Sequence, residues 1–189
     1  MRVSRAEKEK SRARILDSAA RLLRERGVEG ASVADVMSDA GLTHGGFYRH
    51  FDTKDAMVRA ALDSAFDQVL ALLNPTDPSA SGDVASGDLI AFERLYLSDA
   101  HVAAPGRGCP VAALAGEVGR TGDALHWTFG QGVRRIVSAM ADQLSGARAR
   151  RQARAYRHLA MMAGAVAIAR ASDPETAAEV LAACRQARP

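Results

Sequence analysis

The stretch Ser32–Phe51, SVADVMSDAGLTHGGFYRHF, decides the fold. Ser32 is a favoured N-cap residue with Asp35 three positions later, and Gly41 ends the helix that begins there. Thr43 can cap a second short helix. Two short helices joined by a glycine-containing turn are typical of the helix-turn-helix, in which the second helix enters a DNA groove.

The side chains of this stretch divide into a packing set and an outward-facing set. Ala40 and Gly41 provide the small residues of the turn. The apolar side chains that would hold the two helices together are Val36, Leu42, Phe47 and Phe51. The residues left to face DNA are His44, Gly45, Gly46, Tyr48, Arg49 and His50. Tyr48 could instead pack in the core, and His50 could be an ordinary surface residue.

Helical patterns flank this motif. Before it, Ser4 and Glu7 form a plausible capping box for a helix that ends at Gly27. The apolar stripe of that helix is Ile15, Ala19, Leu22 and Leu23. After the motif, Asp52-Thr53 predicts the cap of a longer helix that continues to about residue 73.

The excess positive charge lies in the first third of the chain. Residues 1–54 contain 11 Lys or Arg and 8 Asp or Glu, a net charge of +3, whereas residues 55–189 contain 14 of each sign. Chance explains an excess of this size as well as a nucleic-acid face does. Six residues predict a basic arm ahead of the first helix that either reaches DNA or stays solvated: Arg2, Arg5, Lys8, Lys10, Arg12 and Arg14.

The second part of the chain is also predicted to be helical. Residues 74–88, rich in Pro, Ser, Gly and Asp, are expected to form a flexible loop. Helices are predicted over residues 89–100, 109–120, 123–144, 147–171 and 174–186, and no strand pattern is found. The fold class is therefore all-α with about nine helices: a helix-turn-helix domain over residues 1–53 and a helical domain over residues 54–189.

Composition excludes several classes of protein. Apolar runs are short and interrupted, and Met1–Arg14 lacks the apolar stretch of a signal peptide, so a cytoplasmic protein without a membrane partner is expected. Cys109 and Cys184, the two cysteines, form neither a disulfide framework nor a zinc site. No metal or cofactor motif is present.

The residues from Gly30 to Phe51, followed by Lys54, resemble the signature of the TetR family of transcription regulators. The shared positions include Ala40-Gly41 and Phe47-Tyr48, with Phe51 closing the motif. The sequence departs where Val36-Met37 replaces the more usual Ile-Ala and where Leu42 replaces Val. The motif covers about the first third of the chain.

This resemblance implies a double-stranded DNA operator as partner. Ser32, Thr43 and Lys54 would contact phosphates. His44, Gly45 and Arg49 would lie nearest the base edges, with Gly46 also allowing close approach. Tyr48 and His50 would touch the DNA backbone or a thymine methyl group.

The resemblance also implies a homodimer that senses a small molecule. The last two long helices would pair with their copies, and the middle helices would enclose a pocket whose filling changes the spacing of the two DNA-binding heads. The apolar faces of the last helices could equally be internal core; they comprise Leu159, Met161, Met162, Ala165, Ile168, Ala169, Ala178, Val180, Leu181 and Cys184. The candidate ligand residues are Phe66, Phe92, Tyr96, His101, Cys109, His126, Trp127, Phe129 and Met161.

Cys109 is the candidate for a reactive sensor. It follows Gly108 and precedes Pro110 at a predicted helix start, where the helix dipole would lower its pKa and favour thiolate. An electrophile could then release the DNA. The alternative is a small buried residue that closes the start of the helix.

Two other functions remain open. A regulator with the same DNA-binding head could activate transcription or ignore ligands. An enzyme could use Cys109 as nucleophile with His126 and Glu117, although no catalytic signature surrounds these residues.

Overall fold

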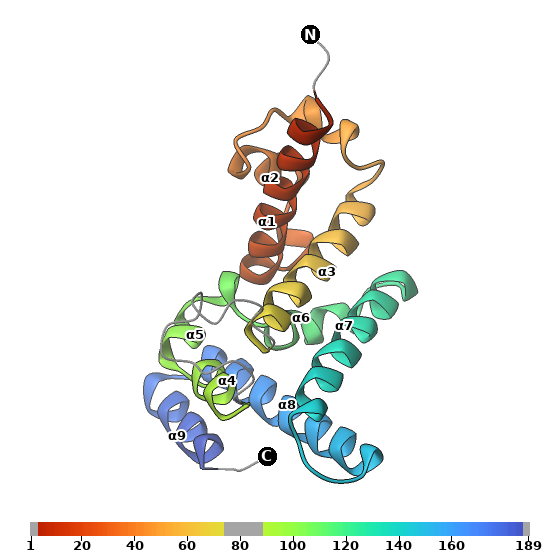
Figure 1. Ribbon diagram of the computed structural model, residues 1–189. Coiled ribbons are helices and arrows are strands. Elements are labelled where there is room, and N and C mark those ends of the chain that lie inside the picture. Colours follow the sequence, from red (N-terminus) through yellow and green to blue (C-terminus); the bar gives the residue numbers. More distant parts are fainter. Residues whose placement is uncertain (1–3, 74–88, 187–189) are drawn as a thin grey trace.

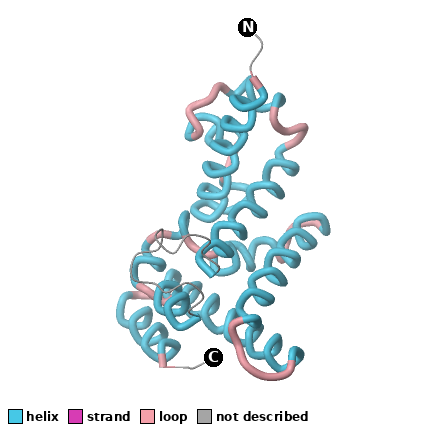
Figure 2. The backbone as a smooth tube through the Cα atoms, viewed as in Figure 1, coloured by secondary structure: helices cyan, strands magenta, loops and turns pink. Residues whose placement is uncertain are grey.

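The computed structural model describes residues 4–73 and 89–186, so the predicted loop at 74–88 lies outside the described residues. Those described form nine α-helices and two short 3-10 helices without a strand (Figure 2). The all-α prediction is therefore confirmed. In chain order the elements are α1 (Arg5–Gly30), α2 (Val33–Asp39), η1 (His44–Arg49), α3 (Lys54–Leu73), α4 (Leu89–Tyr96), α5 (Asp99–Ala103), η2 (Pro105–Arg107), α6 (Pro110–Val118), α7 (Asp123–Asp142), α8 (Arg148–Ala171) and α9 (Pro174–Arg185).

The molecule is elongated, with α1, α2 and η1 at one end and α8 and α9 at the other (Figure 1). Helix α3 joins the two ends because it packs against α1 on one side and α7 on the other. One apolar core runs through the chain, from Ile15 and Phe47 through Phe66 to Met162.

Several helix starts follow local capping as the sequence predicts. The Ser4 Oγ accepts a hydrogen bond from the Glu7 amide at 3.1 Å, and the Thr53 Oγ1 accepts one from the Ala56 amide at 3.1 Å. The Asp173 carboxylate accepts from the amide of Thr176 at 3.1 Å. Each bond satisfies an amide that the first helical turn leaves free.

Gly27 marks a break within α1 rather than its end. Its φ of 78° lies in the left-handed region, which glycine adopts without the steric cost of a Cβ. The chain then resumes helical structure to Gly30. The Glu117 carboxylate of α6 accepts the Val28 amide at 2.7 Å, so a distant side chain supplies the partner that the interrupted helix cannot.

The single helix predicted over residues 89–100 is wrong. The structure ends α4 at Tyr96 and starts α5 at Asp99. The Ser98 Oγ donates to the Leu95 carbonyl at 2.7 Å and accepts from the His101 amide at 3.2 Å, so Ser98 caps a new helix. A serine hydroxyl that competes for backbone partners favours such a break, and full burial of Leu97 holds the turn in place.

The α3–α7 packing depends on a small residue. Gly132 of α7 lies against the ring of Phe66 of α3 so closely that a Cβ there would overlap the ring. Phe129, one turn earlier, meets Phe66 edge-on with ring centroids 5.6 Å apart. Arg135 of α7 adds an ion pair to Asp67 of α3 at 2.5 Å.

The described part of the chain contains neither a candidate membrane-spanning helix nor a candidate metal site. Across residues 4–73 and 89–186 no helix has both the length and the apolarity that a membrane span needs. The same residues contain no cluster of His, Cys, Asp and Glu with the arrangement of a metal site.

Candidate nucleic-acid interface and ligand cavity

The helix-turn-helix lies at one tip of the molecule, formed by α2 and η1. Its turn is closed by the Leu42 amide, which donates to the Met37 carbonyl at 2.8 Å, and by the Gly41 amide, which donates to the Ser38 carbonyl at 2.9 Å. Gly41 has a φ of 64°, so this turn requires glycine. The second helix is a 3-10 helix, and Thr43 precedes it without the side-chain cap that the sequence predicts.

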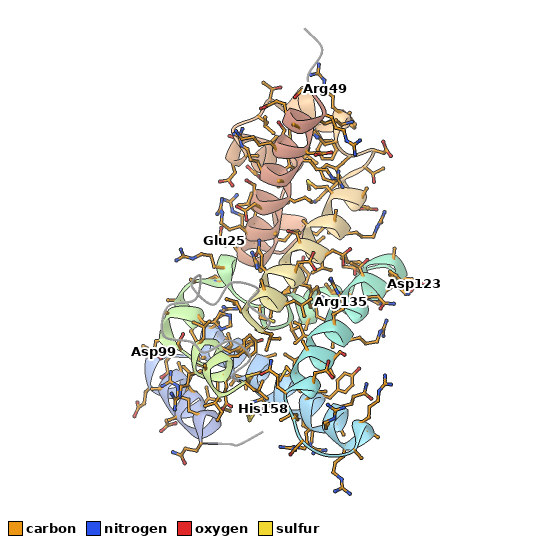
Figure 3. All side chains as sticks on the ribbon, viewed as in Figure 1. Glu25, Arg49, Asp99, Asp123, Arg135 and His158 are labelled. Carbon is orange, nitrogen blue, oxygen red and sulfur yellow. The ribbon has the colours of Figure 1, made fainter. Side chains whose placement is uncertain are left out.

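The outward surface of η1 carries the side chains predicted to face DNA. Phe47 is 1% exposed and Phe51 is 5% exposed, so these two rings anchor the segment. Tyr48 packs edge-on against Phe47 at 5.2 Å but is 71% exposed, which excludes core packing for its ring. Arg49 lies at the tip of the molecule, opposite Asp99 and His158 (Figure 3).

A groove of about 570 Å³ lies between the start of α1 and the segment that comprises η1 and the turn before it. Its lining contains basic and hydroxyl side chains but no carboxylate. The residues are Lys8, Ser11, Met37, Leu42, Thr43, Gly46, Arg49 and His50. A groove of this composition suits a phosphate backbone because its charged groups are all cationic.

The predicted basic arm is wrong in form. Helix α1 begins at Arg5, so the basic residues from Arg5 to Arg14 lie on its first turns, and Arg2 lies outside the described residues. Arg12 is a structural side chain: it donates to the His50 carbonyl at 2.7 Å and lies 4.2 Å from the centre of the Phe51 ring.

His50 is less available than the sequence suggests. Its residue is half-buried, and its Nδ1 is buried without a hydrogen-bond partner among the described residues. Burial, followed by the nearby charges of Lys8, Arg12 and Arg49, lowers the pKa of His50. The ring is therefore neutral near pH 7 and adds no positive charge to the groove.

The phosphate candidates differ in their present contacts. Ser32 is exposed, but its Oγ accepts the Asp35 amide at 3.0 Å and donates to the Asp35 carboxylate at 2.6 Å. That hydroxyl is committed to the α2 cap, and a carboxylate lies beside it. Lys54 stands half-buried at the start of α3. His44 and Gly45 are exposed, as predicted.

A second, separate cavity of about 250 Å³ lies between α1, α3 and the α4–η2 region. Most of its wall is apolar, and two arginines contribute to it. Its lining residues are Arg24, Gln68, Val69, Leu72, Phe92, Leu95, Tyr96, Ala100, His101, Ala104, Arg107, Gly108 and Cys109. Of the residues predicted to bind a ligand, Phe92, Tyr96, His101 and Cys109 therefore meet here.

The remaining ligand candidates lie elsewhere. Phe66 is fully buried in the α3–α7 packing, with Phe129 against it. Trp127 is 66% exposed on α7 and lines no part of this cavity. His126 bonds the Val118 carbonyl at 2.7 Å, and Met161 is half-buried on α8. Aromatic character alone could not separate cavity walls from ordinary core.

The predicted low pKa of Cys109 is wrong. Cys109 is 3% exposed, and burial raises the pKa of its thiol despite its position before α6. The three residues of the enzyme alternative also have other roles. The Glu117 carboxylate binds the Val28 amide, and the His126 ring binds the Val118 carbonyl. The Cys109 amide donates to His101 Nε2 at 3.0 Å.

Arg24 is the cavity residue that sequence reasoning missed. It is 6% exposed, and its guanidinium donates to the Gly108 carbonyl at 3.0 Å and to Gln68 Oε1 at 2.8 Å. An available signal was its position four residues after Ala20, on the buried side of α1. An arginine there must find partners inside the protein.

The segment of residues 105–108, part of which lines the cavity, also packs directly against α1. Gly106 of η2 lies against Arg21 and Glu25 of α1 so closely that a Cβ would overlap the Glu25 carboxylate. Glu25 marks this junction in Figure 3. A change in the shape of residues 105–108 must therefore move either α1 or its side chains.

A sequence model described as "Bacterial regulatory proteins, tetR family" matches residues 15–61, which include the whole helix-turn-helix. The HTH-type transcriptional regulator TtgR of Pseudomonas putida is 39% identical over 64 residues, 34% of this chain and 30% of TtgR. The N-terminal third of the chain is therefore similar to the DNA-binding region of TetR-family regulators.

Other TetR-type relatives match over similar or longer stretches. The HTH-type transcriptional repressor KstR2 of Rhodococcus jostii is 40% identical over 58 residues, 31% of this chain and 28% of KstR2. An HTH-type transcriptional regulator of Mycobacterium tuberculosis is 34% identical over 110 residues, 57% of this chain and 53% of the regulator. The chain thus spans about half the length, or less, of the curated relatives it matches.

Solved structures share the TetR fold over nearly the whole chain. The reduced form of Escherichia coli NemR has a TM-score of 0.70 at 21% identity and covers 95% of this chain and 98% of NemR. A TetR regulator from Chloroflexus aurantiacus has a TM-score of 0.72 at 23% identity, over 95% of this chain and 94% of its own. These structures therefore share the fold of this chain, its helical second half included, at low sequence identity.

Proposed function

We propose that this chain is a DNA-binding transcriptional repressor that acts as a homodimer in the cytoplasm and leaves its operator when a small molecule binds. One observation carries the DNA-binding part. The exposed Tyr48 and Arg49 stand on a segment anchored by buried Phe47 and Phe51, beside a groove without carboxylates. Arg49 can pair bidentately with guanine, a contact worth about 1–3 kcal/mol of discrimination.

A stripe on α8 supports dimerisation. Leu159, Met162 and Ala165 are buried within the chain, so they belong to the internal core and leave the partner face to other residues. Exposed or half-buried small and apolar residues recur at helical spacing along the outer side of α8: Ala153, Ala160, Gly164, Ala167, Ile168 and Ala171. Small side chains at this spacing allow close approach of a second helix, and Ile168 is 50% exposed.

The cavity supports release by a ligand. It is lined by Arg24 of α1 and by residues 107–109, which also contact α1. Two heads of a dimer must lie about 34–36 Å apart to read successive major grooves. A ligand that binds better when α1 is displaced would therefore shift the dimer away from its DNA-bound form. The domain division after residue 53 is part of this proposal.

The test is fluorescence anisotropy of labelled DNA from upstream of the protein's own gene, with random DNA for comparison. We expect specific binding that weakens steeply between two salt concentrations, because phosphate contacts release counterions. Arg49→Ala should lose most of the preference for the specific fragment, whereas Arg26→Ala, exposed on α1 away from η1, should retain it. Equal binding of specific fragments and random DNA by the wild type would refute the proposal.

A promoter-reporter assay then determines the sign of regulation. Repression predicts higher reporter output when the gene is deleted. Lower output on deletion would identify an activator with the same DNA-binding head.

A further inference from the structure

Arg24 is a buried cation that forms no ion pair with a carboxylate of the described residues. Its side chain donates to the carbonyls of Ala20 and Gly108 and to Gln68 Oε1, all uncharged acceptors, at 2.9, 3.0 and 2.8 Å. The carboxylate nearest in this network is that of Asp17, which accepts from the Gln68 amide at 3.3 Å instead. A guanidinium carries five N–H donors, so one remains free on each terminal nitrogen.

The described residues that line the cavity beside Arg24 include no acidic side chain. No Asp or Glu is found among its lining residues, while exposed Arg107 adds a second cation. Arg170 stands just behind the wall, donates to the carbonyls of His101 and Val102, and keeps a buried NH1 group without a partner in the described structure. Buried charge is costly unless it is paired, so these cations favour an anionic occupant.

A second observation points to the same occupant. Tyr96 is 4% exposed, and its hydroxyl has no hydrogen-bond partner of good geometry among the described residues. It lies in the cavity wall beside the Cys109 thiol, which is at most a weak acceptor. His101 is not available, because its Nδ1 bonds the Tyr96 carbonyl at 2.5 Å and its Nε2 accepts the Cys109 amide. Among the described residues, the Tyr96 hydroxyl therefore has at most the weakly accepting Cys109 sulfur as its hydrogen-bond acceptor.

The rest of the wall sets the size and polarity of the ligand. Val69, Leu72, Phe92 and Leu95 make it predominantly apolar. A volume of about 250 Å³ lies at the lower end of ligand pockets. The occupant must therefore be small, with an apolar body and one polar end.

Resting on the ligand response proposed above, we propose that the effector is a small apolar carboxylate. Its carboxylate pairs with the free N–H groups of Arg24 and accepts a hydrogen bond from the Tyr96 hydroxyl, while the apolar walls enclose its body. The same guanidinium holds the Gly108 carbonyl and thereby joins α1 to the 105–108 segment. An anion that draws Arg24 toward itself competes with that bond and loosens α1 from the ligand-binding half.

The test measures binding of a matched set of probes by calorimetry and by thermal shift, at constant ionic strength. Benzoate, phenylacetate and 3-phenylpropanoate are each compared with the amide and the amine of the same skeleton. We expect at least one acid to bind about tenfold or more tightly than its amide, because charge-assisted hydrogen bonds are about twice as strong as neutral ones. The amines should not bind.

Variants locate the binding. Arg24→Met should abolish the preference for the acid, and Arg26→Met, which removes the same charge from the exposed side of α1, should keep it. If circular dichroism shows that Arg24→Met does not fold, the Tyr96→Phe variant tests instead whether the acid binds in this cavity. That variant removes a hydroxyl whose partner among the described residues is at most the weakly accepting Cys109 sulfur, so we expect nearly unchanged stability and acid binding weakened several-fold.

Three results would overturn the carboxylate proposal: equal binding of acid and amide, tighter binding of an amine, or no binding by any probe. DNA anisotropy on the same samples separates this outcome from failure of the proposed function. Specific DNA binding without acid binding overturns the effector class alone. Acid binding by a protein that prefers no DNA fragment speaks against the repressor and leaves the anion site intact.

Discussion

Gly45 and Gly41 differ in whether their surroundings require a glycine. No heavy atom lies within 4 Å of the position a Cβ would take there, and its φ lies outside the left-handed region. Nothing in the described part of the chain therefore requires glycine at 45, and we propose that a side chain is absent there to let DNA approach. Gly41, four residues earlier, is the opposite case, because its φ of 64° disfavours any side chain. One glycine permits approach from outside, and the other permits the turn.

The pair Gly45→Ala and Gly41→Ala tests this division. Gly45→Ala should leave the free energy of unfolding unchanged or slightly raised and weaken specific DNA binding by about 1–3 kcal/mol, the cost of one lost base contact. Gly41→Ala should lower stability by about 1–2 kcal/mol, because a side chain is strained in the left-handed region. Urea unfolding and DNA anisotropy measure the two effects; unchanged DNA affinity in Gly45→Ala would remove this residue from the interface.

Cys109 should be slow to react in the native protein. It is 3% exposed, so a reagent has little access to its sulfur, and burial raises its pKa, so little of the thiol is in the reactive thiolate form. We expect iodoacetamide to modify half-buried Cys184 first, as followed by mass spectrometry of digested protein, and to reach Cys109 only after unfolding. Rapid labelling of Cys109 in the folded state would restore the electrophile-sensor hypothesis.

At the scale of elements, local capping and long-range packing decide different things. Helix starts at Ser4 and Ser32 could be predicted because a side chain and an amide three residues away settle them. The division of α4 from α5 was missed because the apolar pattern continues through the break. The Ser98 hydroxyl ends one helix by donating to the Leu95 carbonyl and caps the next by accepting from the His101 amide. The contact of Gly132 with Phe66 involves residues on different helices, and no local pattern announces it.

The two glycines of α7 give a prediction at this scale. Gly132→Ala should lower the free energy of unfolding by about 1–3 kcal/mol, because the added methyl overlaps the fully buried ring of Phe66. Gly130→Ala is the matched control: a Cβ there comes no closer than 3.6 Å to Arg134, so higher helix propensity should raise stability by up to about 1 kcal/mol. Urea titrations followed by circular dichroism measure both, and equal effects would mean that Phe66 moves aside without cost.

At the scale of the whole molecule, α3 and the 105–108 segment connect the two ends. Helix α3 packs on α1 and α7, Arg24 binds the Gly108 carbonyl, and Glu117 of α6 accepts the Val28 amide. These contacts tie the end that carries Arg49 to the half that contains the cavity. The proposed ligand response depends on such contacts, because binding in the cavity would have to change the position of a distant head.

The outer stripe of α8 should be the dimer face. Ile168→Glu places a charge on that stripe, and we expect it to convert a dimer into a monomer of about 20.0 kDa in light scattering after size-exclusion chromatography. DNA affinity should fall with it, since one head alone reads one half-site. Ser138→Glu, exposed on α7, is the control and should stay dimeric. An Ile168→Glu protein of unchanged mass would place the interface elsewhere.

The sequence by itself determined the all-α class, the helix-turn-helix and most helix boundaries, because these follow from residues within a few positions of each other. It also located the exposed Tyr48 and Arg49. Only the tertiary structure decided which aromatic residues line a cavity and that Arg24 is a buried cation in its wall. It also showed that burial raises the pKa of Cys109 despite its position at the start of a helix. Burial and charge pairing depend on residues far apart in the chain, and no local pattern contains that information.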